Sequence, residues 1–238
     1  MKVIPILTPL LAFALFLVPF TKADENLPIT ANEQAAFTPD EVLERLMDGN
    51  ERYVAGEVTD LNIKKRIKVA ATGQYPKAVI LSCLDSRVPV ELVFDVGIGD
   101  IFVGRVAGNI ENEDQLGSME FATKAAGACL VMVLGHESCG AVKGACDDVQ
   151  MGNLTALLSK IKPAVDAVPT DDGSERSSKN SAFVAKVVEE NVRQTVEDIR
   201  ERSDVLAEME KNGEIKIVGA IYSLQDGSVT LLKESSDS

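Results

Sequence analysis

The chain has only one histidine, His136, among its 238 residues. A zinc-protease helix of the His-Glu-x-x-His type needs two histidines, so the pair His136-Glu137 cannot belong to that class of enzyme. A dinucleotide-binding loop needs three glycines followed by a helix. The segment Gly97-Ile98-Gly99 has two, and a predicted strand follows it. Both of these motif assignments are therefore excluded.

Basic residues are also scarce. The chain has 24 Lys and Arg against 37 Asp and Glu, which gives a net charge of −13. Because phosphate binding needs clustered cations, this balance disfavours a nucleic-acid partner and indicates a soluble, acidic surface. The hydrophobic fraction of 45% is ordinary for a globular protein, and the length suits one domain with a substantial core. No internal repeat is present.

The first 23 residues differ from the rest of the chain. Lys2 is followed by residues 3–20, which are apolar apart from Thr8, and Thr21-Lys22-Ala23 offers a small-residue cleavage site. We expect a signal peptide at 1–23 and an exported protein, periplasmic or secreted. The alternative is a membrane anchor. However, prolines interrupt the apolar run, which at 18 residues is shorter than the roughly 20 that a spanning helix needs, so we expect no stable membrane insertion after cleavage.

Two short apolar runs each lead to side chains that bind soft metals. Residues 78–81 precede Cys83, and residues 130–134 precede His136, with Cys139 three positions later. If both runs are neighbouring parallel strands, their carboxyl ends meet at the sheet edge where ligand sites form. Two thiolates and an imidazole suit zinc, and with one open position they match a known catalytic arrangement.

Two further side chains follow Cys83 at alternating positions. In an extended segment Cys83, Asp85 and Arg87 point the same way. Asp85 could therefore fill the fourth metal position or accept a hydrogen bond from zinc-bound water, and Arg87 lies within reach of its carboxylate. Taken singly, a strand cysteine is usually a small buried hydrophobe, and an Asp-x-Arg pair is worth under about 1 kcal/mol. Their combination with the only histidine favours a metal site.

The motifs Cys-x-Asp-x-Arg at 83–87 and His-x-x-Cys at 136–139, with Arg-Val-Ala-Gly-Asn at 105–109 between them, resemble those of β-class carbonic anhydrases. The similarity runs from about residue 38 to about residue 232. It implies reversible hydration of carbon dioxide to bicarbonate and a proton by a zinc-bound hydroxide, in a homodimer or a dimer of dimers. In this reading Cys83, His136 and Cys139 hold Zn²⁺. Asp85 orients the water or takes its proton, and Arg87 holds Asp85 off the metal.

The same resemblance implies a substrate pocket. Gln74 matches a glutamine that bonds substrate across the subunit interface, Phe102 and Phe121 match aromatic walls, and Gly140 matches a glycine whose backbone N–H contacts bicarbonate. For the two phenylalanines, ordinary core packing is nearly as good an interpretation. A different class of function also has to be weighed. Asp85 could permanently close a structural Cys₂-His-Asp site in a non-catalytic zinc protein, although such a site would not need Arg87.

The whole pattern predicts an α/β protein with a mainly parallel central sheet, flanking helices, an N-terminal helical arm at 24–60 and a zinc-binding catalytic domain at 61–238. An antiparallel hairpin, with strands at 215–224 and 228–232, is expected at the C-terminal edge. Helices are expected from Thr38 onward, then at 89–94, 115–126, 140–149, 153–167, along 184–199 and from 203 to 213. Residues 170–180 are expected to form a mobile loop or a plain linker between two of these helices.

Two cysteines remain outside the expected metal site, Cys129 and Cys146. We expect both to be structural free thiols, and a disulfide between them is the alternative in an exported chain.

Overall fold

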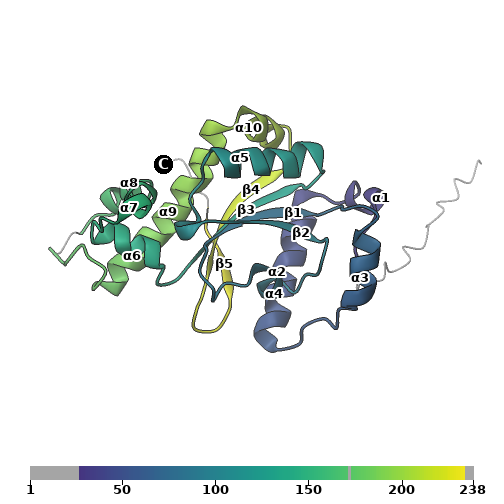
Figure 1. The fold of residues 1–238 in the computed structure, drawn as a ribbon, viewed down its shortest axis with the longest axis horizontal. Coiled ribbons are helices and arrows are strands. Elements are labelled where there is room, and N and C mark those ends of the chain that lie inside the picture. Colours follow the sequence, from purple (N-terminus) through teal and green to yellow (C-terminus); the bar gives the residue numbers. More distant parts are fainter. Residues whose placement is uncertain (1–26, 171–172, 234–238) are drawn as a thin grey trace, which may run out of the picture.

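The computed structural model describes residues 27–170 and 173–233, so the predicted signal peptide lies outside the described residues. A five-stranded sheet in the order β2-β1-β3-β4-β5 forms the centre of the described chain (Figure 1). Strands β1 to β4 are mutually parallel, whereas β5 runs antiparallel to β4 at one edge. This confirms the predicted α/β class and the C-terminal hairpin. The strands are β1 Ala78–Ser82, β2 Ile101–Arg105, β3 Leu130–His136, β4 Lys216–Tyr222 and β5 Val229–Leu231.

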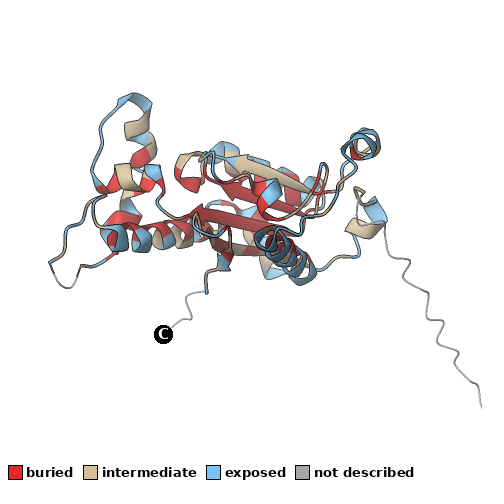
Figure 2. Cartoon of the chain, turned by 90° about the horizontal axis from the view of Figure 1, so that it is seen from below, coloured by how far each residue is buried: buried red, intermediate tan, exposed pale blue. Residues whose placement is uncertain are grey.

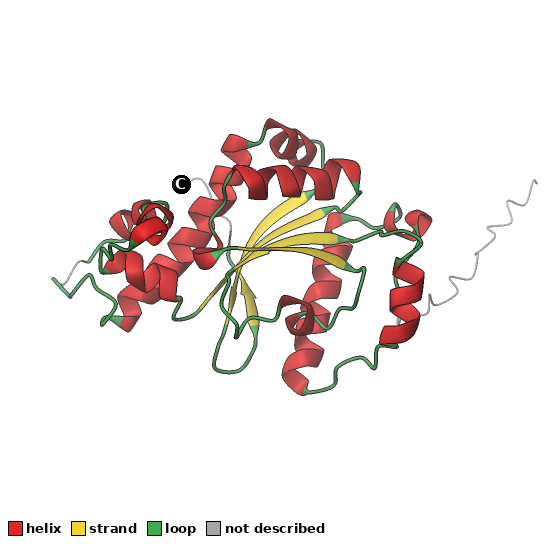
Figure 3. Ribbon diagram, viewed as in Figure 1, coloured by secondary structure: helices red, strands yellow, loops and turns green. Residues whose placement is uncertain are grey.

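Helices cover both faces of the sheet (Figure 3). Apolar side chains of α5, α9 and α10 pack on one face, and those of α2 and α4 pack on the other. The short helices α6 to α8 form a third cluster with the first half of α9, beside the carboxyl ends of the strands. The helical elements are α1 Ala31–Gln34, α2 Pro39–Ala55, α3 Ile63–Ala70, α4 Val90–Val93, η1 Ala107–Asn109, α5 Glu113–Glu120, η2 Phe121–Ala125, α6 Gly140–Cys146, α7 Gly152–Leu158, α8 Lys162–Ala167, α9 Ser181–Arg202 and α10 Asp204–Lys211.

The two central strands β1 and β3 are buried along their whole length, as a parallel sheet with two covered faces requires (Figure 2). Every residue of β1 and β3 is buried, which explains why their sequences are continuous apolar runs. Among the described residues, no helix is long and apolar enough to cross a membrane.

Local capping signals decide where two helices begin. The Thr38 side chain accepts the backbone N–H of Glu41, whose carboxylate accepts the backbone N–H of Thr38 in return, and Pro39 occupies the first turn. Ser203 caps α10 in the same way by accepting the N–H of Leu206. Both predicted starts are confirmed.

Two predicted helices are wrong in detail. The segment 153–167 is broken into α7 and α8, with Pro163 in the first turn of α8, because proline cannot donate a hydrogen bond to a preceding helical turn. The segment 115–126 ends in a wider π turn, η2, that shifts the helical register. As a result Ala122 and Thr123 face the core, whereas Phe121, for which a pocket wall or core packing was expected, is 56% exposed.

Helix α3 was not predicted, and its burial pattern is inverted. Arg66 is fully buried and forms an ion pair with Asp100, with 2.5 Å between Nη2 and Oδ2. The isoleucines of this helix, Ile63 and Ile67, are instead about half exposed. Arg66 lies between Ile63 and Ile67 on one face of this eight-residue helix, so a charged residue interrupts the apolar stripe by which the helix could be recognised.

Candidate zinc site

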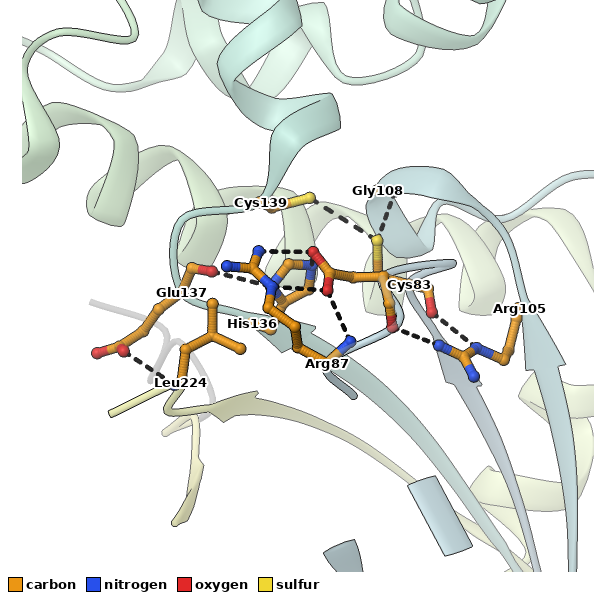
Figure 4. Close-up of polar contacts among 9 residues, drawn as sticks. Cys83, Arg87, Arg105, Gly108, His136, Glu137, Cys139 and Leu224 are labelled. Atoms are coloured by element: carbon orange, nitrogen blue, oxygen red, sulfur yellow. Dashed lines mark hydrogen bonds and ion pairs between the residues drawn. The ribbon is translucent and has the colours of Figure 1, made fainter. Parts of the chain in front are cut away.

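The sheet brings together the three predicted metal ligands. Cys83 directly follows β1, His136 ends β3, and Cys139 is the N-cap of α6. Because Ser82 of β1 lies opposite Leu134 of β3 in a parallel pair, the carboxyl ends of the two strands adjoin. The three side chains are buried, and their ligand atoms all lie within 4.8 Å of one another (Figure 4).

The spacing of the two sulfurs fits one metal ion. The Sγ atoms of Cys83 and Cys139 are 3.9 Å apart. Two thiolates at about 2.3 Å from a tetrahedral zinc ion are separated by roughly 3.8 Å. The two thiols therefore fit a zinc ion without rearrangement.

The imidazole of His136 is oriented for metal binding. Its Nδ1 lies 2.8 Å from the backbone carbonyl oxygen of Glu137, so Nδ1–H donates and Nε2 carries the free lone pair. Nε2 is buried, and no hydrogen-bond partner for it exists among the described residues. A buried ring nitrogen without a partner is costly unless it binds something else, such as a metal ion. The residues present therefore fit the zinc that the ligand set implies.

The first cysteine is fixed by a glycine loop. The backbone N–H of Gly108, in η1, donates to Cys83 Sγ at 3.3 Å, and Asn191 of α9 donates to the Gly108 carbonyl at 2.9 Å. Gly108 has φ of 76°, and a Cβ there would lie 2.5 Å from Cδ1 of Ile161. Only glycine fits this position, because the backbone is left-handed and Ile161 occupies the space.

The two thiols affect one another strongly. The hydrogen bond from Cys139 and that from the Gly108 N–H hold the pKa of Cys83 well below its ordinary value. The neighbouring Cys83 sulfur and burial raise the pKa of Cys139. A second thiolate beside the first is costly, so a cation bound between the two sulfurs favours ionisation of both cysteines.

Asp85 lies beside these ligands and is held by Arg87. The Arg87 Nε donates to Oδ1 at 2.9 Å, its Nη2 donates to Oδ2 at 2.7 Å, and its backbone N–H also donates to Oδ1. These bonds keep the pKa of the Asp85 carboxyl far below its usual range. Asp85 Oδ2 is 3.7 Å from His136 Nε2, and the carboxylate is not part of the compact group of three ligands.

Arg105 braces the same segment, a role that the sequence does not predict. From the end of β2, its Nε donates to the carbonyl of Cys83 at 3.0 Å and its Nη2 to the carbonyl of Asp85 at 2.5 Å (Figure 4). The available signal was its place in the motif at 105–109. Its action needs the β1–β2 register, which sets Arg105 opposite Ser82.

The predicted substrate-pocket residues are not gathered around this site within one chain. Gln74 precedes β1, at the end of the strand opposite Cys83. Phe102 of β2 lies opposite Val79 and packs edge-on against Phe121, with ring centroids 6.2 Å apart. Gly140, the first residue of α6, is next to Cys139 and would have open space around a Cβ. Only Gly140 of these four is adjacent to a proposed ligand.

All four cysteines are free in this structure, including Cys129 and Cys146, so the expected free thiols are present and the alternative disulfide is not.

The fold and the site together define a class of protein, namely a zinc protein whose parallel sheet delivers two thiols and one imidazole to its carboxyl edge. Comparison with known proteins identifies the family. The carbonic anhydrase family model matches residues 78–229. Carbonic anhydrase 2 of Mycobacterium tuberculosis is 37% identical over 193 residues, covering 78% of this chain and 89% of that one. The chain belongs to the β-carbonic anhydrase family.

Solved structures agree with this fold. The β-carbonic anhydrase CafA of Aspergillus fumigatus matches with a TM-score of 0.62 and 21% identity, over 83% of this chain and 92% of that one. A tetrameric β-carbonic anhydrase of Sordaria macrospora also matches with a TM-score of 0.62, at 20% identity over 81% of this chain and 97% of that one.

Proposed function

We propose that this chain catalyses the reversible hydration of carbon dioxide to bicarbonate and a proton, with Zn²⁺ held by Cys83, His136 and Cys139. The observation that carries the proposal is the compact ligand group with Asp85 engaged by Arg87 beside it. A bound zinc ion supplies the charge that lowers the pKa of a coordinated water and so provides a nucleophile near neutral pH.

The chain's own residues orient that water and move its proton. Asp85 is ionised because Arg87 forms two side-chain bonds to it, so the carboxylate accepts hydrogen bonds and donates none. Its Oδ2 lies close enough to the ligand group to accept a hydrogen bond from a water molecule there, to orient that water and to receive its proton. Gly140, with open space around it, leaves room for substrate beside Cys139.

The alternative, a non-catalytic site closed by Asp85, fits the geometry less well. Both Asp85 oxygens are engaged by Arg87, and closing the site would break a bidentate ion pair. Stopped-flow measurement of carbon dioxide hydration by the zinc-loaded protein tests the choice. Catalysis that disappears in the zinc-free protein and returns with added zinc is the expected result. A zinc-loaded protein that does not accelerate hydration contradicts the proposal.

We also propose that the active form is a homodimer or a dimer of dimers. Gln74 lies beyond the far end of β1, about 17 Å of strand away from Cys83, so a glutamine that reaches a site would have to serve the partner subunit's site. Ile63 and Ile67 leave an exposed apolar face on α3 that a second copy would cover. The match to a tetrameric relative supports an assembly of this kind.

Light scattering after gel filtration tests this assembly. Ile67→Glu is expected to shift the protein towards the monomer, because a buried interface does not tolerate an unpaired charge. The matched control is Val205→Glu, at another exposed apolar residue, on α10. An unchanged mass for Ile67→Glu would remove α3 from the interface.

The location of the protein stays a prediction. We propose that residues 1–23 are cleaved on export, leaving the arm at 24–60 and the catalytic domain at 61–238. Mass spectrometry of the protein recovered from the native host's culture medium or cell envelope would measure its N-terminus. An intact Met1 would contradict cleavage.

A further inference from the structure

The residue after the zinc-binding histidine, Glu137, is tied to β4 and to the turn that follows it. Its backbone N–H donates to the Tyr222 carbonyl at 3.1 Å. Its carboxylate Oε2 accepts the backbone N–H of Leu224 at 3.0 Å and lies 3.5 Å from the Ser223 hydroxyl. Figure 4 shows this side chain directed towards Leu224, away from the ligand group. Glu137 thus joins the end of β3 to the C-terminal hairpin.

The backbone carbonyl of Glu137 also contacts the metal site. Its carbonyl oxygen accepts the Nδ1–H of His136 at 2.8 Å and so sets both the tautomer and the direction of the imidazole. If the peptide group between Glu137 and Ser138 rotated, its carbonyl could no longer hold the imidazole in this direction. The orientation of the ring therefore depends on what restrains the backbone at residue 137.

The backbone next to this peptide is strained. Ser138 has φ of 52°, a left-handed conformation that costs a non-glycine residue roughly 1–2 kcal/mol. This turn is what brings His136, at the end of β3, and Cys139, at the start of α6, to the same metal position. A strained turn persists only when neighbouring contacts hold it, and the bonds of Glu137 are such contacts.

We propose that the Glu137 carboxylate is a positioning residue for the zinc site. By accepting the Leu224 N–H, it holds the strained 136–139 turn in the conformation that aims His136 Nε2 and Cys139 Sγ at one metal ion. It acts through its reach and its ability to accept a hydrogen bond, and its negative charge is not required. This inference rests on the zinc site proposed above.

The test compares zinc affinity in three folded variants by competition with a chromogenic chelator. Glu137→Ala removes the acceptor and is expected to weaken zinc binding about tenfold, the usual effect of losing a partner of a metal ligand. Glu137→Gln keeps an acceptor oxygen at the same reach and is expected to retain affinity within about threefold. The control is Asp147→Ala at the other end of α6. Asp147 also accepts a backbone N–H, from Ser178 at 2.8 Å, but away from the ligand group. It is expected to bind zinc like the unmodified protein.

A second measurement reads the ring directly. Because His136 is the only histidine, the zinc-loaded protein has a single set of imidazole signals in a ¹H–¹⁵N correlation spectrum. Loss of the Nδ1–H signal to solvent exchange is expected in Glu137→Ala and not in Glu137→Gln or Asp147→Ala.

Three outcomes would overturn the proposal. These are unchanged zinc affinity in Glu137→Ala, an equal loss in the Asp147→Ala control, and a tenfold loss in Glu137→Gln. The result for Glu137→Gln tests the proposal even if Glu137→Ala does not fold. Because the readout is zinc binding, a protein that binds zinc but fails to hydrate carbon dioxide would contradict the proposed function and leave this inference standing.

Discussion

The two segments that supply the zinc ligands are held in different ways. The segment after β1 carries Cys83 and Asp85 and is braced by charged side chains, one of which, Arg87, is 55% exposed. The segment after β3 carries His136 and Cys139, which are buried, and its ring is oriented by a main-chain carbonyl. The buried segment is therefore suited to holding the metal. The charged segment is suited to placing the group that handles the proton.

Removing a ligand from the buried segment should have the largest effect. Cys139→Ser is expected to lose most of its zinc, because a hydroxyl is a far poorer zinc ligand than a thiolate. Zinc per chain, measured by plasma emission spectrometry, checks this result. The matched control is Cys146→Ser at the other end of α6, a buried cysteine outside the ligand group, which should keep its zinc. Full zinc retention in Cys139→Ser would show that Cys139 is not a ligand.

Removing Arg87, which holds Asp85 in the charged segment, should lower turnover without loss of zinc. Arg87→Ala is expected to keep zinc and to lower kcat by about 10²-fold, because Asp85 is then free to leave the position from which it handles the proton. Stopped-flow kinetics and zinc content are measured together. Arg52→Ala, which breaks an ion pair with Asp95 at 2.6 Å elsewhere, is the control for loss of a surface arginine. Near-normal turnover in Arg87→Ala would show that the Arg87–Asp85 pair is an ordinary ion pair with no role in catalysis.

Cys83 in the charged segment is also supported by a buried hydrogen bond from Asn191 to the loop at Gly108. Removing that bond should lower the stability of the fold. Asn191→Ala deletes the bond to the Gly108 carbonyl and is expected to lower the free energy of unfolding by about 1–3 kcal/mol, because a buried acceptor is left unsatisfied. Urea unfolding measures the change. Gln194→Ala, on the same helix, removes a part-buried bond to Glu190 one turn away and should change the stability much less. Equal losses in the two variants would mean that the Gly108 contact has no special weight.

The smallest expected effect concerns proton export. The one histidine belongs to the proposed ligand group, so no second imidazole is available to carry a proton from the site to solvent. Turnover at pH 7 is therefore expected to rise severalfold as the concentration of an imidazole-type buffer is raised at constant ionic strength. Turnover that is indifferent to buffer concentration would show that another group in the chain carries the proton.

The ligand group and the pairing of β1 with β3 could be predicted from the sequence for a physical reason. Inner parallel strands are buried on both faces, so the segments that became β1 and β3 are apolar throughout and easy to recognise. The next polar side chains along the chain then fall at the sheet's carboxyl edge. Cys83, His136 and Cys139 were therefore predictable as a group, and capping residues such as Thr38 marked helix starts just as directly.

Other features of the fold and the site depend on contacts between distant segments, which the local sequence pattern does not show. Helix α3 escaped detection because Arg66 is buried by an ion pair with Asp100, a residue 34 positions away. Phe121 turned outward because a π turn shifted its register. The contacts of Arg105, Asn191 and Glu137 all join segments that meet only when the sheet assembles. By itself, the sequence determined which side chains can bind zinc. Long-range hydrogen bonds determined how those side chains are aimed.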